Sequence, residues 1–170
     1  EGPRVYVERI NIVGNVRTLD KVIRRQFNLA EGDAFDTTQL QVARRKVKSL
    51  GFFRDVQISR EAGSAPDRSV VNIDVEEQST GELSFGLGFS TTDGPTGNIS
   101  IRERNLLGRG QDLRVGFSGS GRTQEIDFSF TEPAFLARDL SAGFDVFRET
   151  TNLQSESSYD AKELGFALRF

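Results

Sequence analysis

Residues 82–90 read Glu-Leu-Ser-Phe-Gly-Leu-Gly-Phe-Ser, so that large apolar residues alternate with small or polar ones. Successive side chains of a β-strand point to opposite faces. The large residues would therefore share one face of a strand; they are Leu83, Phe85, Leu87 and Phe89. This stretch predicts a strand with one apolar face and one polar face.

Five further stretches of the C-terminal half repeat this alternation. We expect six strands, over residues 82–92, 96–104, 111–121, 124–132, 139–149 and 160–170. Consecutive antiparallel pairing is the simplest topology for strands spaced in this way. Strands of about 9–11 residues match a tilted crossing of a bilayer, and known single-chain bacterial barrels begin at about eight strands. Residues 80–170 therefore predict antiparallel amphipathic β-strands of an incomplete transmembrane β-barrel.

Residues 1–79 have a mixed periodicity that predicts a separate α+β domain. The expected elements are a strand over residues 5–13, a short helix capped by Thr18, a second helix from Asp36 to Leu50, and strands over residues 52–59 and 70–75. Asp36 has the side chain of a helix N-cap, and Gly51 suits the left-handed position after a helix. The predicted order is β-α-α-β-β, with a domain boundary between residues 79 and 80.

The composition excludes much catalytic chemistry. Histidine and cysteine are absent, so the chain has no imidazole base, no thiolate nucleophile and no His/Cys metal site. The formal net charge of −3 gives no argument for nucleic acid. Glu76 and Glu77 are adjacent, and we expect them to keep the tether between the two halves hydrated. We predict no enzymatic activity, no cofactor and no metal.

Five short motifs occur in a specific order. They are Val13-Gly14-Asn15, Leu50-Gly51-Phe52-Phe53, Ser79-Thr80-Gly81, Asn105-Leu106-Leu107-Gly108-Arg109-Gly110 and Thr131-Glu132-Pro133-Ala134-Phe135. In this order the chain resembles the outer-membrane protein assembly factor (BamA) family. The resemblance covers the last POTRA domain and the first barrel strands of that family.

The resemblance implies a non-enzymatic insertase of the Gram-negative outer membrane, with the POTRA part in the periplasm. Its first barrel strand would template incoming barrel proteins. An unpaired strand edge in lipid leaves backbone groups unsatisfied at several kcal/mol each, which favours pairing with another strand. The residues expected to pair through their backbone are Glu82, Leu83, Ser84, Phe85, Gly86, Leu87, Gly88 and Phe89. Gly86 and Gly88 would either loosen this seam or relieve crowding inside the barrel.

For the POTRA part the resemblance implies binding of nascent chains and of accessory lipoproteins. An edge strand from Arg54 to Arg60 could accept an extended peptide by main-chain pairing, which involves Arg54, Val56 and Ile58. Glu31 stands where the family contacts a lipoprotein. The alternative for Glu31 is an ordinary carboxylate in a turn.

Two other functions stay open on the sequence. One is a polypeptide-translocating pore of the same superfamily, of the two-partner secretion type; the other is a soluble β-rich binding module. Tryptophan is absent, so an aromatic girdle at the membrane interfaces would rest on Phe135, Phe147 and Tyr159. The two outer strands of such a fragment are also expected to pair edge to edge with another copy.

Overall fold

The computed structural model describes residues 4–153 and 159–170. The chain divides into two compact units. The first comprises Glu1–Thr80 together with Leu107–Arg109, and the second comprises Gly81–Leu106 and Gly110–Phe170. Among the described residues, no helix is long and apolar enough to cross a membrane.

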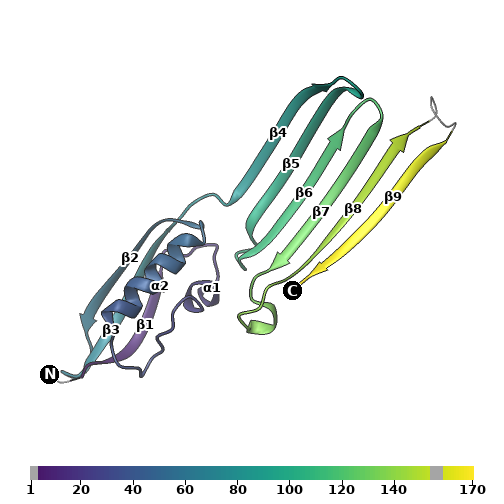
Figure 1. Cartoon of the computed structure of the whole chain (residues 1–170). Helices are drawn as coiled ribbons and strands as arrows, with labels where there is room; N and C mark the ends of the chain where they lie inside the picture. Colours follow the sequence, from purple (N-terminus) through teal and green to yellow (C-terminus); the bar gives the residue numbers. More distant parts are fainter. Residues whose placement is uncertain (1–3, 154–158) are drawn as a thin grey trace. The chain divides into compact units, whose positions relative to one another are not determined.

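The first unit contains three strands and two helices in the predicted order β-α-α-β-β (Figure 1). The elements are β1 Tyr6–Val13, α1 Asp20–Arg24, α2 Thr37–Ser49, β2 Phe53–Ala62 and β3 Arg68–Glu77. The strand order is β1-β3-β2, with β1 parallel and β2 antiparallel to β3. The central strand is therefore β3, and β1 and β2 are the two edges of the sheet.

The helices cover one face of this sheet and close a single apolar core. The stripe of α2 contributes Leu40, Ala43 and Val47, each at most 4% exposed. These side chains cluster with buried residues of all three strands, among them Val56 and Ile73. The predicted N-cap of α2 is confirmed, because the Asp36 carboxylate accepts hydrogen bonds from the backbone N–H groups of residues 38 and 39 at 2.8 and 3.3 Å.

The predicted cap of the first helix is wrong. Leu19 occupies the N-cap position of α1, and no side chain caps this helix. Thr18 is instead 2% exposed, and its N–H donates to Glu77 Oε1 at 2.7 Å. Because Thr18 is held at the end of β3, α1 begins two residues later and spans five residues.

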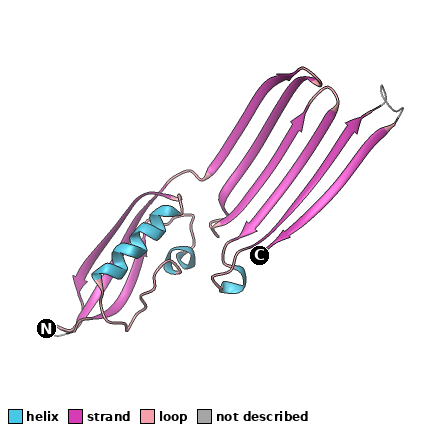
Figure 2. Cartoon of the chain, viewed as in Figure 1, coloured by secondary structure: helices cyan, strands magenta, loops and turns pink. Residues whose placement is uncertain are grey.

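The second unit is a six-stranded antiparallel sheet, as predicted (Figure 2). Its strands are β4 Gly81–Ser90, β5 Gly94–Leu106, β6 Gln111–Gly119, β7 Thr123–Glu132, β8 Ala142–Asn152 and β9 Asp160–Arg169. They pair in chain order from β4 to β9. The described strands form an open sheet, with β4 and β9 at its two edges.

The start of β8 differs from the prediction by three residues. A 3₁₀ turn at Phe135–Ala137 precedes it, and the N–H of Phe135 donates to the carbonyl of Leu140 at 2.8 Å. This bond closes the turn, so Leu140 lies before the strand and not within it. At the other end β8 continues to Asn152. The predicted loop over residues 150–159 thus overlaps the strand, and residues 154–158 lie outside the described part of the chain.

Candidate functional site

Apolar side chains form rows that cross all six strands of the second unit. The register gives one row of Leu83, Ile101, Val115, Phe128, Val146 and Phe166. The next row contains Phe85, Ile99, Phe117, Ile126 and Leu164, and the basic residue Arg148 takes the place of an apolar residue on β8. The apolar side chains of these rows are exposed, from 38% at Val146 to 79% at Phe166, except that of Phe128, which is half-buried. A contiguous exposed apolar surface that extends over six strands indicates a contact with lipid or with another protein.

The opposite face of the same strands is polar. Arg102 pairs with Asp112 across β5 and β6. Arg169 Nε lies 2.7 Å from Asp145 Oδ2, and Arg169 Nη2 also donates to the hydroxyl groups of Ser129 and Thr131 at 3.0 Å each. This network links β7, β8 and β9 on one side of the sheet. The two faces therefore differ in the way that the lipid side and the lumen side of a barrel differ.

One residue of the predicted aromatic girdle is misplaced. Phe147 alternates in phase with Asp145 and Glu149, and so it lies on the polar face. Its partner on β9 is Gly165, where a Cβ would overlap the Phe147 ring. Phe147 thus fills the space above a glycine inside the sheet. It does not belong to an interfacial belt.

The apolar residues form a band that crosses the strands obliquely. On β4 this apolar band runs from Leu83 to Phe89, and on β9 it runs from Leu164 to Phe170. Leu83 is level with Phe166 in the register, so the band shifts by four residues across five strand spacings. Four residues span about 14 Å along the strands, and five strand spacings span about 24 Å across them. The band is therefore inclined by about 30° to the perpendicular of the strands, and the strands would tilt by the same angle from the membrane normal. Strands of membrane barrels tilt by a similar amount, about 35–45°.

The predicted strand-pairing residues, Glu82 to Phe89, all lie on β4. This strand pairs with β5 from Gly81 to Ser90, and none of the described strands pairs with its other side. We call that side the free edge. The polar side of Gly86 and Gly88 is occupied, because a Cβ at Gly86 would overlap Asn98 and one at Gly88 would lie 2.9 Å from Thr96 Oγ1. These contacts explain the glycines by crowding, and a looser seam stays a prediction.

The predicted docking residues Arg54, Val56 and Ile58 lie on the edge strand β2. They do not form one accessible surface, since the Val56 side chain is fully buried. The Val56 N–H donates to Asp55 Oδ1 at 2.9 Å, and the Val56 carbonyl accepts from Arg44 Nε at 2.8 Å. Hydrogen bonds from Gln57 and from this N–H lower the pKa of Asp55. A peptide that pairs at Val56 would have to displace two side chains of the protein itself.

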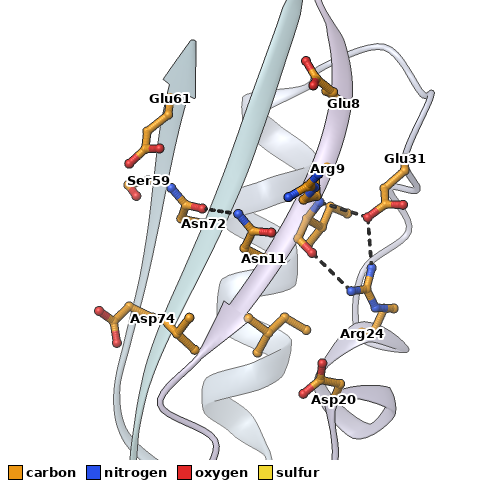
Figure 3. A pocket seen from close by; sticks show the side chains of 13 residues that line it. Glu8, Arg9, Asn11, Asp20, Arg24, Glu31, Ser59, Glu61, Asn72 and Asp74 are labelled. Atoms are coloured by element: carbon orange, nitrogen blue, oxygen red, sulfur yellow. Dashed lines mark hydrogen bonds and ion pairs between the residues drawn. The ribbon is translucent and has the colours of Figure 1, made fainter. Parts of the chain in front are cut away.

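Glu31 lies at the rim of a hollow that is lined by residues of the three strands and by Asp20 and Arg24 of α1 (Figure 3). Its Oε1 accepts from the Ile10 N–H at 3.1 Å and lies 3.6 Å from Arg24 Nη1. Arg24 also donates to the Ile10 carbonyl at 3.1 Å. Glu31 therefore fastens the turn between the helices to β1. Its side chain remains 48% exposed, and its role as a docking residue stays a prediction.

Glu77 has a function in the fold that no local sequence pattern indicates. Its carboxylate accepts the N–H groups of Arg17 and Thr18 at 3.0 and 2.7 Å. Burial by itself raises the pKa of Glu77, but the hydrogen bonds from Thr18 and Arg17 outweigh this effect and the pKa is lowered. Glu77 is thus a clamp between the end of β3 and the loop before α1. It does not serve merely to hydrate the tether.

Two family models match the chain in sequence order. Residues 5–78 match the POTRA model, described as a surface antigen variable number repeat, and residues 105–170 match the Omp85 superfamily domain. The outer membrane protein assembly factor BamA of Neisseria meningitidis serogroup B is 34% identical over 147 residues, which cover 86% of this chain and 18% of that protein. BamA of Buchnera aphidicola is 31% identical over 83% of this chain and 23% of that protein.

Solved structures give the same assignment. The crystal structure of BamA from Haemophilus ducreyi lacking POTRA domains 1–3 superposes with a TM-score of 0.85 at 27% identity, over 98% of this chain and 32% of that one. CdiB from Acinetobacter baumannii has a TM-score of 0.59 at 14% identity, which shows a common fold alone. The chain spans about a fifth of the length of the curated relatives. The chain therefore consists of a POTRA domain followed by the antiparallel strands of a BamA-like barrel fragment, of which residues 105–170 match the Omp85 superfamily domain.

Proposed function

We propose that the chain acts in the assembly of β-barrel proteins into the bacterial outer membrane, by offering the free edge of β4 to an incoming strand. The observation that carries this proposal is the combination of that edge with the apolar band. An edge beside an apolar face would lie within lipid, where no water replaces the missing hydrogen bonds. The names of the relatives, outer membrane protein assembly factors, support the same activity.

The physical basis is main-chain pairing and requires no catalytic group. Each buried and unpaired N–H or C=O group costs several kcal/mol in hydrocarbon, so ten residues of free edge strongly favour a partner strand. Pairing through the backbone tolerates many sequences, which suits varied substrates. The alternation of large and small side chains on β4 would select the register, because a shift by one residue puts apolar groups on the polar face.

The POTRA domain would lie in the periplasm and bind nascent chains and accessory lipoproteins. The Arg44 and Asp55 side chains cover the β2 edge at Val56, so we place peptide pairing further along this edge, at Ile58 and Arg60. Glu31 is our candidate for a lipoprotein contact because its carboxylate is half-exposed at the rim of the hollow.

Cysteine cross-linking tests the role of β4, since the native chain has no cysteine. Ser84→Cys places a thiol on β4, and Ser118→Cys is the matched control on β6, which is paired on both sides. Ala167→Cys reports on the other edge strand, β9. We expect a substrate with a cysteine in its last strand to cross-link to position 84 during assembly, and weakly to 118 and 167.

The same experiment separates the alternative function. A chain that passes an unfolded polypeptide along its polar face would cross-link at Ser118→Cys as readily as at Ser84→Cys. That result would favour the translocating pore and contradict templating at β4. A uniform lack of cross-links under conditions in which the substrate is assembled would also contradict it.

A further inference from the structure

Two basic residues interrupt the apolar face at one corner of the second unit. Arg148 on β8 is level with Ile126 on β7 and Leu164 on β9. Lys162 lies opposite Thr150, one row further along the same face. Both side chains are exposed, and the described residues include no ion-pair partner for either.

Both basic residues lie at the rim of the apolar band. On β8, Phe144 and Val146 belong to the band and Arg148 is the next residue on that face. On β9, Leu164 is the apolar residue at this end of the band, and Lys162, two residues before it in the sequence, is the next residue on the same face beyond the band. Diagonal neighbours of this kind on adjacent strands have Cβ atoms about 7 Å apart, so long side chains can reach one common group. Long basic side chains at such a rim extend their charged ends toward water.

The two rims of the band carry opposite charge. At the rim where β4 begins, the same face carries Glu103 on β5 and Glu132 on β7. At the rim where β4 ends it carries Arg148 and Lys162, with Asp160 one further row away from the band. The charge beside the apolar surface is therefore positive at one end and negative at the other. An anionic group that lies just outside hydrocarbon would be attracted to the rim that carries Arg148 and Lys162.

We propose that Arg148 and Lys162, with the Thr150 hydroxyl between them, bind the phosphate of a lipid headgroup. The proposal rests on the membrane placement given under Proposed function. A guanidinium can donate two parallel hydrogen bonds to a phosphate, and an ammonium adds a point charge. The apolar rows next to the pair identify the source of the phosphate, because acyl chains that cover these rows bring headgroups to their rim.

Vesicle binding of the full chain tests this site. The chain is mixed with vesicles of phosphatidylcholine, with or without phosphatidic acid, and the bound fraction is measured by flotation. Each basic residue near an anionic surface increases binding by about fivefold, so R148Q/K162Q should reduce binding to phosphatidic acid vesicles by about 25-fold. The matched control R114Q/R138Q removes the same charge from the polar face and from a turn, and should reduce binding much less. R148K/K162R should retain binding.

The outcomes separate this site from the membrane placement. If the chain binds neither kind of vesicle, the membrane placement and the headgroup site both fail. Equal binding of the native chain and R148Q/K162Q to both kinds of vesicle overturns the headgroup site and leaves the membrane placement intact. An equal loss in the matched control also overturns it. Inorganic phosphate at the concentration of the lipid should not compete, and full competition would contradict a lipid-bound ligand.

Discussion

Val115 lies in the middle of the apolar band on β6, between Ile101 of β5 and Phe128 of β7. Substitution of Val115 by arginine therefore tests whether this face contacts hydrocarbon. If it does, the charge stands near the middle of the bilayer, at a cost of about 2–4 kcal/mol. This corresponds to a roughly 30- to 1000-fold smaller equilibrium constant for folding into a bilayer. If water covers the face, an exposed substitution changes stability by about 0.5 kcal/mol or less.

The matched control for Val115→Arg is Ser118→Arg, which adds the same side chain to the polar face of the same strand. The assay is the folded fraction in phospholipid vesicles during a urea titration, read from protection against trypsin. We expect V115R to lose about 2–4 kcal/mol relative to the native chain, and S118R to stay within about 0.5 kcal/mol. Equal costs for V115R and S118R would refute a lipid-covered face.

Three further predictions concern the POTRA domain. Glu77→Gln should lower the free energy of unfolding by about 1 kcal/mol at neutral pH in a denaturant titration. Because folding lowers the pKa of Glu77 from 4.5, the ionised carboxylate stabilises the fold above pH 4.5, and this stabilisation is lost as the pH falls through the folded pKa. The free energy of unfolding of the variant should lack this pH-dependent loss. Gly14→Ala should cost more than about 1 kcal/mol in thermal unfolding, because φ is +89° and a Cβ would overlap a β3 carbonyl, whereas Gly32→Ala, at φ +97° in open space, should cost less. Arg44→Met frees the Val56 carbonyl, which would extend the pairing surface beyond Ile58, and should increase the affinity for an extended peptide about fivefold. An unchanged affinity in a peptide titration would show that a bound peptide does not reach Val56.

The element order could be predicted because its signals are local. Asp36 caps α2 through N–H groups two and three residues away, and alternation over ten residues is enough to identify β4. The face of Phe147 could also have been predicted, since it alternates out of phase with Phe144 and Val146. Phe147 was assigned to the girdle because the sequence has few aromatic residues that could form one, although the alternation placed Phe147 on the polar face.

Other features depend on contacts between distant parts of the chain. Glu77 binds a loop 59 residues away, and no local pattern distinguishes it from its neighbour Glu76. The cover of Val56 by Arg44 requires the position of α2 against β2. The oblique course of the apolar band, and with it the place of Arg148 and Lys162, follows from the register of five strand pairs. A one-residue error in any pair would have changed the face of every residue beyond it.

The proposed function depends above all on the ability of the free edge of β4 to accept a strand. Hydrogen–deuterium exchange of the chain in lipid vesicles, with and without a peptide that matches the last strand of a barrel protein, tests it most directly. We expect alternate amides from Glu82 to Phe89 to exchange more slowly with the peptide, while the amides of β7, which is paired on both sides, stay unchanged. Unchanged exchange in β4, or equal protection of the β9 edge from Lys162 to Leu168, would contradict the claim.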